Sequence, residues 1–234
     1  YRPRPSRVLM GIWSADFPQE LECRQQFRRL FQVFEDRNDA RICSLGDFLE
    51  DPDAYRDCQL VYTFVLGGNA NAPTELVDDS RPIIASEHIS TIAPADKNMS
   101  DMTLLNIKEN MEHGKSQTWF YCALTVLEHF DYVGKCDSDS VLDLIKYFDF
   151  ASRHLPPAPY NEGIIVGKPV NKQWWQMAQS QSEKRKKEGF LVARYGDILH
   201  LYAAGQLYIL SVDLVATVVR EAVTGRHQNY IENI

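Results

Sequence analysis

The sequence predicts a single α/β domain with one mixed, mostly parallel sheet flanked by helices. Short apolar runs alternate with amphipathic stretches over residues 1–150, an alternation typical of parallel strands connected by helices. The length of 234 residues and the hydrophobic content of 44% suit one domain with a substantial core. The chain shows no internal repeat, so we expect residues 1–234 to form one domain, entered through a linker at residues 1–6.

The first half of the chain supplies most of the predicted strands. Residues 7–13 form an apolar run that predicts a buried strand. Pro18 then begins a helix predicted to reach about Arg37, because large apolar side chains recur there at helical spacing. Further strands are predicted at residues 41–45, 60–66 and 82–85.

The second half continues the alternation. Residues 101–130 predict a helical stretch with a candidate break at His113-Gly114. The next predicted elements are a strand at 132–136, a helix at 141–150, an irregular proline-containing segment at 152–160 and a strand at 163–166. Residues 168–189 hold a dense run of charges and predict a mobile surface loop. Residues 199–219 are long enough to span a bilayer, but Asp213 would be costly in hydrocarbon, so we expect buried soluble structure.

Charge and cysteine content exclude several classes of function. A formal net charge of −7 argues against a nucleic-acid or acidic-membrane partner, because either would require a basic face. Local basic groups could still hold a small anion such as a phosphate. None of the five cysteines forms a C-x-x-C pair, so we expect neither a zinc site nor a thioredoxin-type site. Their number does not assign a compartment.

The clearest chemical motif is Asp137-Ser138-Asp139, directly after the strand predicted at 132–136. In an extended backbone, residues two apart point the same way, so both carboxylates could converge on one cation while Ser138 faces away. Such oxygen ligands suit Mn²⁺ or Mg²⁺. Ser140 would then begin a capping-box-like helix start, and phosphates bind readily at a strand–helix junction of this kind.

A D-x-D motif by itself is as easily a turn with two solvated carboxylates. Lys135 favours a ligand site over a solvated turn, because it lies two residues before Asp137 and should share its side of the strand. A cation beside the carboxylates favours a site for a negatively charged ligand over a plain turn.

Four short motifs resemble, in the same order, those of the β1,3-galactosyltransferase family (glycosyltransferase family 31). The family's R-x-x-I-R-x-x-W helix is similar to RQQFRRLF at residues 24–31, and its helix with Lys-Thr and a tryptophan is similar to KSQTW at 115–119. Its K-x-D-[DS]-D-x-[FV] motif resembles KCDSDSV at 135–141. Its Y-P-x-Y-x-x-G-x-x-Y-x-x-S motif is approximated by YAAGQLYILS at 202–211, with the proline and some spacing lost.

The resemblance implies a GT-A fold with a Rossmann-type sheet, and an inverting transfer of a hexose, galactose or N-acetylglucosamine, from a UDP-sugar to a glycan hydroxyl. It implies Mn²⁺ at Asp137 and Asp139. It also implies a type II membrane protein of the Golgi lumen, whose anchor is absent from this chain. Gly205 and Tyr208 are expected near the sugars. The residues expected near the donor nucleotide or supporting it are Asp137, Ser138, Asp139, Lys135, Arg24, Arg28 and Lys115.

The sequence departs from the family at the expected catalytic carboxylate. The family places Glu-Asp-Val downstream of its Gly-x-x-Tyr motif, whereas this chain reads Glu232-Asn233-Ile234. Three alternatives stay open: Glu232 is the base in a shifted register, the base lies beyond the end of this chain, or the protein lacks it.

Some candidates have plainer interpretations. Arg24 and Arg28 could belong to the solvated face of an amphipathic helix. The neighbouring Trp174 and Trp175 lie in a polar stretch where both are hard to bury, so one is a candidate to stack on a sugar ring. Two other functions fit the sequence. One is an inactive sugar-binding partner subunit of the same fold. The other is a metal-dependent nucleotidyl- or phosphotransferase, although the absence of a phosphate-binding loop after Gly67-Gly68 argues against it.

Overall fold

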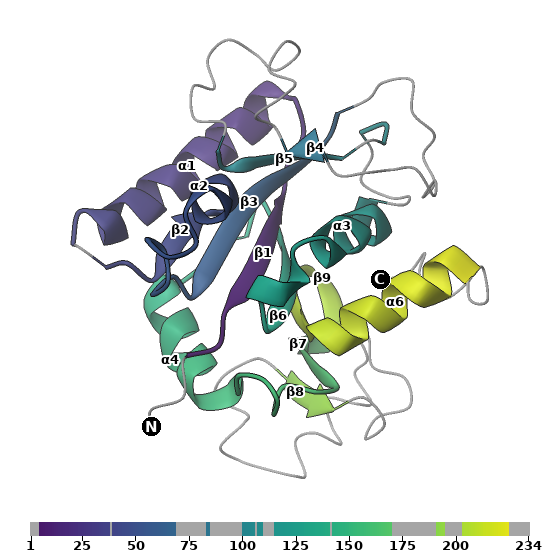
Figure 1. The fold of residues 1–234 in the computed structure, drawn as a ribbon. Coiled ribbons are helices and arrows are strands. Elements are labelled where there is room, and N and C mark those ends of the chain that lie inside the picture. The colour runs from purple at the N-terminus through teal and green to yellow at the C-terminus, as the bar shows by residue number, and fades with distance from the viewer. Residues whose placement is uncertain are drawn as a thin grey trace.

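A computed structural model describes residues 5–37, 39–68, 83–84, 100–105, 107–109, 115–140, 142–169, 191–194 and 203–224. Within these residues the chain forms one nine-stranded mixed sheet with helices on both faces (Figure 1). The predicted α/β class is therefore confirmed.

The sheet is mixed, with most strands running in one direction. The strands are β1 (Val8–Trp13), β2 (Ile42–Ser44), β3 (Leu60–Gly67), β4 (Ile83–Ile84), β5 (Met102–Leu105), β6 (Tyr132–Asp137), β7 (Ile164–Pro169), β8 (Leu191–Arg194) and β9 (Ala203–Ser211). Their order is β4-β5-β3-β1-β6-β9-β7-β8, and β2 pairs with β3. β1, β2, β3, β5, β6 and β7 run in one direction, and β4, β8 and β9 run in the other.

Helices cover both faces of the sheet. They are α1 (Pro18–Glu35), α2 (Leu45–Glu50), α3 (Lys115–Leu124), α4 (Leu144–His154) and α6 (Val212–Thr224), with a 3₁₀-helix η3 (Leu127–His129). Along β1, Val8, Met10 and Ile12 pack with α1 and α4. Leu9 and Trp13 pack with α2, α3 and α6 on the opposite face. Because both faces are buried, the strand is a continuous apolar run rather than an alternating one.

The structure contradicts part of the helix predicted over residues 101–130. Met102–Leu105 is the strand β5, which pairs in parallel with β3. All four residues are buried, and a short run that is apolar on both sides carries no periodicity to separate strand from helix. Among the described residues, the helical pattern holds only over α3, which ends at Leu124, after which a turn leads into the 3₁₀-helix η3.

The boundaries of two other predicted segments also differ. α4 begins at Leu144 rather than at residue 141, because Asp143 is the N-cap: its carboxylate accepts a hydrogen bond from Lys146 N at 3.1 Å. Ser140 belongs instead to the turn after β6. The loop predicted at 168–189 loses its first two residues to β7, and residues 170–189 lie outside the described part of the chain.

In the long apolar stretch at 199–219, residues 203–219 are divided between β9 and α6, and residues 199–202 lie outside the described part of the chain. Asp213 lies in the first turn of α6, where its carboxylate accepts a hydrogen bond from Gly163 N (2.9 Å). Among the described residues, none of the helices has both the length and the apolar character required of a membrane span.

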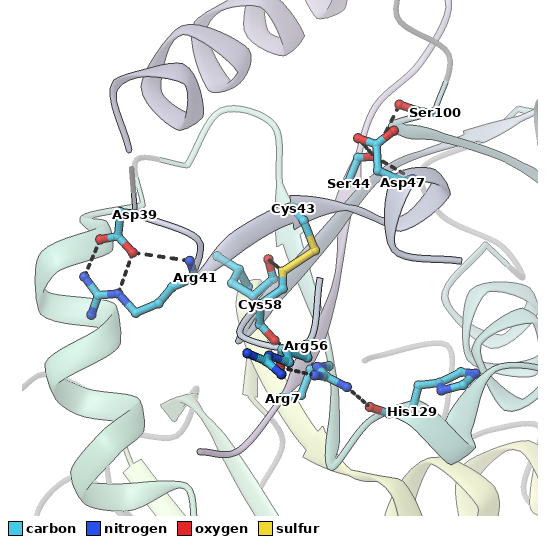
Figure 2. Close-up of a disulfide and its surroundings, with 11 residues drawn as sticks. Arg7, Asp39, Arg41, Cys43, Ser44, Asp47, Arg56, Cys58, Ser100 and His129 are labelled. Carbon is cyan, nitrogen blue, oxygen red and sulfur yellow. Dashed lines mark hydrogen bonds and ion pairs between the residues drawn. A yellow bond between two sulfur atoms is a disulfide. The ribbon is translucent and has the colours of Figure 1, made fainter. Parts of the chain in front are cut away.

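A disulfide joins Cys43 of β2 to Cys58, just before β3, a pairing that the number and spacing of the cysteines left open (Figure 2). Beside it, the Arg7 guanidinium donates to the Cys58 carbonyl oxygen at 2.8 Å. It also donates to the carbonyl oxygens of Arg56 (2.7 Å) and His129 (3.2 Å). The disulfide and the Arg7 contacts lie just before β1, β3 and β6. They therefore stabilise the amino edge of these parallel strands.

Candidate functional site

The candidate site lies at the opposite, carboxyl edge of the parallel strands, the edge at which open α/β sheets bind ligands. Trp13, the last residue of β1, pairs with Asp137, the last residue of β6, and Gly11 pairs with Lys135. On its other side β6 pairs with β9, which places Tyr208 beside Lys135. Side chains alternate along strands, so Trp13, Lys135, Asp137 and Tyr208 all point to the face covered by α3.

Lys135 and Asp137 form an ion pair, with 2.9 Å between Nζ and Oδ1. The ammonium group also lies over the rings of Trp13 (5.2 Å to the centroid) and Tyr208 (6.0 Å). Aromatic faces attract cations, and the lysine side chain is only 10% exposed, so its position is well defined. The prediction that Lys135 and Asp137 share one side of the strand is confirmed.

The Asp137 carboxylate has an unusual environment. Its Oδ1 atom is buried, and the described residues direct no hydrogen bond at it, although Lys135 lies within ion-pair distance. Buried carboxylate oxygens normally accept hydrogen bonds. The side chain as a whole is 23% exposed, so the carboxylate is reachable from the edge of the sheet. Asp137 therefore offers an oxygen that a cation could use as a ligand.

Ser138 and Asp139 lie in a turn, which corrects the geometric basis of the metal-site prediction. β6 ends at Asp137, and Ser140 N donates to the Asp137 carbonyl oxygen at 3.0 Å to close the turn. Asp139 is exposed, whereas Asp137 and Ser138 are half-buried. Convergence of the two carboxylates therefore depends on the turn and not on strand alternation.

Lys115, the first residue of α3, links three elements at this edge. Its Nζ donates to the Ser14 carbonyl oxygen, just after β1, and to Glu109 Oε1, both at 2.6 Å. The other Glu109 oxygen accepts a hydrogen bond from Gly67 N at the end of β3, also at 2.6 Å. Burial lowers the pKa of Lys115, and the Glu109 carboxylate opposes that shift. Sequence reasoning missed Ser14 and Glu109, because neither belongs to a motif.

Arg24 is buried and not part of a solvated face. Its Nη1 donates to the Ser14 hydroxyl (2.6 Å) and to the Ala15 carbonyl oxygen (2.8 Å). The Ser14 hydroxyl in turn donates to Glu20 Oε2 at 3.2 Å. Arg24 therefore stabilises the loop between β1 and α1, which borders the site.

Arg28 is engaged further from the acidic turn. Its guanidinium forms two hydrogen bonds with the buried carboxylate of Asp101, at 2.6 and 2.9 Å, and lies 5.2 Å from the Phe64 ring centroid. This contact attaches α1 to the start of β5. In this structure Arg28 supports the fold behind the site.

The remaining candidates divide into buried and undescribed residues. Tyr208 is 1% exposed and packs against Phe120, with 6.0 Å between ring centroids, so it supports Lys135 from within the core. Burial raises the pKa of Tyr208. Gly205 lies within β9. Trp174, Trp175 and Glu232 lie outside the described residues.

The described residues contain no group of three or more His, Cys, Asp or Glu side chains that could hold a metal ion by themselves. A site of two carboxylates would need further oxygen ligands from a bound diphosphate or water, as Mg²⁺ and similar hard ions commonly use.

A family model described as galactosyltransferase matches residues 83–233, more than half of the chain. The matched region contains α3, the D-S-D turn and β9, whereas Arg24 and Arg28 precede it. This match confirms the predicted resemblance, and the mostly parallel sheet between helices is consistent with a GT-A-like fold. None of the curated proteins compared with the chain matches it.

Proposed function

Because the chain belongs to the galactosyltransferase family, and so is a glycosyltransferase domain, we propose that it moves a hexose from a UDP-sugar to a glycan hydroxyl. The sugar is galactose or N-acetylglucosamine, and the transfer inverts the anomeric carbon. The observation that carries the proposal is the carboxyl edge of the sheet, where the acidic turn at 137–139 adjoins two largely buried lysines.

The two lysines place ammonium groups at this edge within a protein of net charge −7, each already paired with a carboxylate, Lys115 with Glu109 and Lys135 with Asp137. Lys115 and Lys135 lie 5.9 Å and 5.2 Å from the centroid of the same Trp13 ring. Their ammonium groups are close enough that Lys135 contributes to the lowered pKa of Lys115, after burial and against Glu109. A diphosphate is the part of a UDP-sugar that such a pair of cations would attract.

Asp137 and Asp139 are the residues that we propose to hold Mn²⁺, or alternatively Mg²⁺. The buried Oδ1 of Asp137, at which no described residue directs a hydrogen bond, fits a metal ligand, and both side chains offer the oxygens that these ions prefer. When bound, the metal would neutralise negative charge on the departing diphosphate. Ser138 lies between the two ligands in the turn.

The other residues position this edge. Arg24 and Lys115 hold the chain after β1, and Tyr208 supports Lys135. The attacking hydroxyl needs a base, for which Glu232 is the candidate in this chain. We propose Trp174, Trp175 and Gly205 for the side of the site that receives the sugars.

We also propose that the domain acts in the Golgi lumen as part of a type II membrane protein. The Cys43–Cys58 disulfide supports an oxidising compartment, since such bonds are rare in the cytosol.

The test is hydrolysis of UDP-galactose and of UDP-N-acetylglucosamine, with water as the acceptor of the sugar, measured as UDP release with and without Mn²⁺. We expect Mn²⁺-dependent release by the wild type and a loss of about 100-fold or more in Asp139→Asn, since even residues that support metal ligands are worth 10- to 100-fold. The matched control is Asp143→Asn, an exposed carboxylate in the same segment whose role is to cap α4. It should retain release, because an N-cap exchange to asparagine costs little.

A second candidate is a sugar-binding partner subunit, favoured by Glu232-Asn233 in place of the family's Glu-Asp. UDP binding without release of UDP from either donor would support it over the transferase. Release of phosphate or diphosphate from a nucleoside triphosphate would instead indicate a phospho- or nucleotidyltransferase.

A further inference from the structure

We propose that Lys135 is a built-in counter-ion that keeps Asp137 from binding a divalent cation tightly until the diphosphate of the donor arrives. The inference rests on the proposed function and adds to it an order of assembly, in which metal and nucleotide enter the site together. It concerns how this chain's own lysine competes with a metal for one carboxylate oxygen.

The Lys135 ammonium group contacts the Asp137 oxygen that a metal would use as a ligand. Lys135 Nζ lies 2.9 Å from Asp137 Oδ1, the oxygen at which no described residue directs a hydrogen bond. A metal that used this oxygen would come within a few ångströms of the ammonium group. The lysine already satisfies the charge of the carboxylate that the metal needs.

The surroundings hold the ammonium group in place. Its side chain is 10% exposed and is flanked by the rings of Trp13 and Tyr208. Trp119 lies against Gly11, the β1 residue paired with Lys135, and its Nε1 donates to the Gly134 carbonyl oxygen next to Lys135 at 3.3 Å. Lys135 therefore cannot easily withdraw into solvent when a second cation approaches.

A second ammonium group lies near that of Lys135. Lys115 is buried beside the same Trp13 ring. A divalent ion entering alone would meet repulsion from both ammonium groups, offset in part by Asp137, by the exposed Asp139 and by Glu109, which pairs with Lys115 at 2.6 Å. At an effective dielectric constant of about 20, one unit charge a few ångströms away changes the affinity for a divalent ion by more than ten-fold.

The diphosphate reverses the sign of this interaction. It brings at least two negative charges, which attract the metal and the lysine at once, so the cation that repels the metal alone stabilises the ternary complex. By linkage, UDP should raise the affinity for Mn²⁺ by the same factor as Mn²⁺ raises the affinity for UDP. Lys135 should account for a large part of that factor.

The plainer interpretation makes the opposite prediction. If Lys135 only orients Asp137 for the metal, then removing the lysine weakens metal binding whether or not nucleotide is present. If Lys135 is a competitor, removing it strengthens metal binding in the absence of nucleotide.

The experiment measures Mn²⁺ binding by the electron paramagnetic resonance signal of the free ion, with and without saturating UDP. The variants are Lys135→Met and Lys135→Gln, which remove the charge, and Lys135→Arg, which keeps it. Lys146→Met is the matched control, because Lys146 lies on α4, is 86% exposed and pairs with the N-cap residue Asp143. Thermal unfolding checks that each variant is folded.

Without UDP, Lys135→Met and Lys135→Gln should bind Mn²⁺ at least about ten-fold more tightly than the wild type. Lys135→Arg and Lys146→Met should match the wild type within about two-fold. With UDP, the advantage of the neutral variants should vanish or reverse, and calorimetry should show weaker UDP binding by them in Mn²⁺.

Equal or weaker Mn²⁺ binding by both neutral variants without UDP would overturn the inference. If the wild type binds no Mn²⁺ even with UDP, the proposed metal site fails, and the inference fails with it. If the predicted pattern of binding appears but no donor releases UDP, the inference stands while the proposed transferase activity is rejected.

Discussion

Arg28 of α1 and Asp101 at the start of β5 form a two-point ion pair, with 2.6 Å from Nε to Oδ2 and 2.9 Å from Nη2 to Oδ1. The Asp101 side chain is fully buried, and its carbonyl oxygen accepts a hydrogen bond from Phe64 N at 2.7 Å. One acidic residue thus connects the first helix to β3 and β5. Its contribution is to the stability of the scaffold behind the site.

Arg28→Met should therefore lower the free energy of unfolding by about 3–5 kcal/mol, because it removes the guanidinium group that pairs with the buried Asp101 carboxylate. Urea denaturation measures the change. Arg29→Met is the control, since Arg29 is exposed on the same helix and should change stability by less than about 0.5 kcal/mol. In the double variant Arg28→Met/Asp101→Asn, part of the loss should return. Equal stability of the two single arginine variants would contradict this role for Arg28.

Tyr147 and Tyr132 should respond in opposite directions to removal of the hydroxyl group. The Tyr147 hydroxyl is buried, and the described residues give it no hydrogen-bond partner, so Tyr147→Phe should raise stability by about 1 kcal/mol or leave it unchanged. The Tyr132 hydroxyl donates to the Pro156 carbonyl oxygen at 2.7 Å, so Tyr132→Phe should cost about 1 kcal/mol. Chemical denaturation measures the change in the free energy of unfolding of each variant. A loss of stability in both variants would contradict the difference between the two hydroxyl groups.

The same tyrosine predicts a pH dependence. Burial raises the pKa of Tyr147 above its ordinary value of 10.0. Below pH 10 the hydroxyl is protonated in both folded and unfolded chains and has no effect. Above pH 10 it ionises only in the unfolded chain, so stability falls as pH rises. Tyr147→Phe removes that fall, and its advantage over the wild type should widen between pH 9 and pH 11 in denaturation measurements.

The Cys43–Cys58 disulfide should stabilise the domain by about 3 kcal/mol, as expected for a closed loop of about 15 residues. A reducing agent should therefore lower the midpoint of thermal unfolding of the wild type. In Cys43→Ala/Cys58→Ala the midpoint should already be lower and should no longer respond to the reductant. A reductant effect that persists in the double variant would assign the sensitivity to another cysteine.

Gly67→Ala should be among the most damaging small substitutions. A Cβ at this position would lie 2.6 Å from the backbone N and Cα of Glu109, which supplies the partner of Lys115. Main chain cannot move aside as a side-chain end can, so we expect a loss of about 1–3 kcal/mol together with weaker UDP binding. Gly163→Ala, at a positive φ of 66°, is the comparison, since it should cost about 1 kcal/mol without affecting nucleotide binding. If Gly67→Ala binds UDP as tightly as the wild type, then the contact of Glu109 with Lys115 does not contribute to nucleotide binding.

The sequence by itself determined the elements whose signal is local. The apolar runs of β1, β3 and β6 and the helical spacing of α1 predicted those elements, because period and length are properties of consecutive residues. The shared side of Lys135 and Asp137 was predictable for the same reason, since they are two residues apart in one strand. The turn that places Asp139 was not, because strand alternation stops at Asp137.

Only the tertiary structure decided which distant groups meet. Lys115 reaches the Ser14 carbonyl across 101 residues, and Glu109 meets Gly67 across 42. Arg24 and Arg28 look alike in sequence, yet one is buried at the β1–α1 loop and the other is paired with Asp101, 73 residues away. Such partners are chosen by strand order and helix packing, which bring together residues that no local periodicity relates.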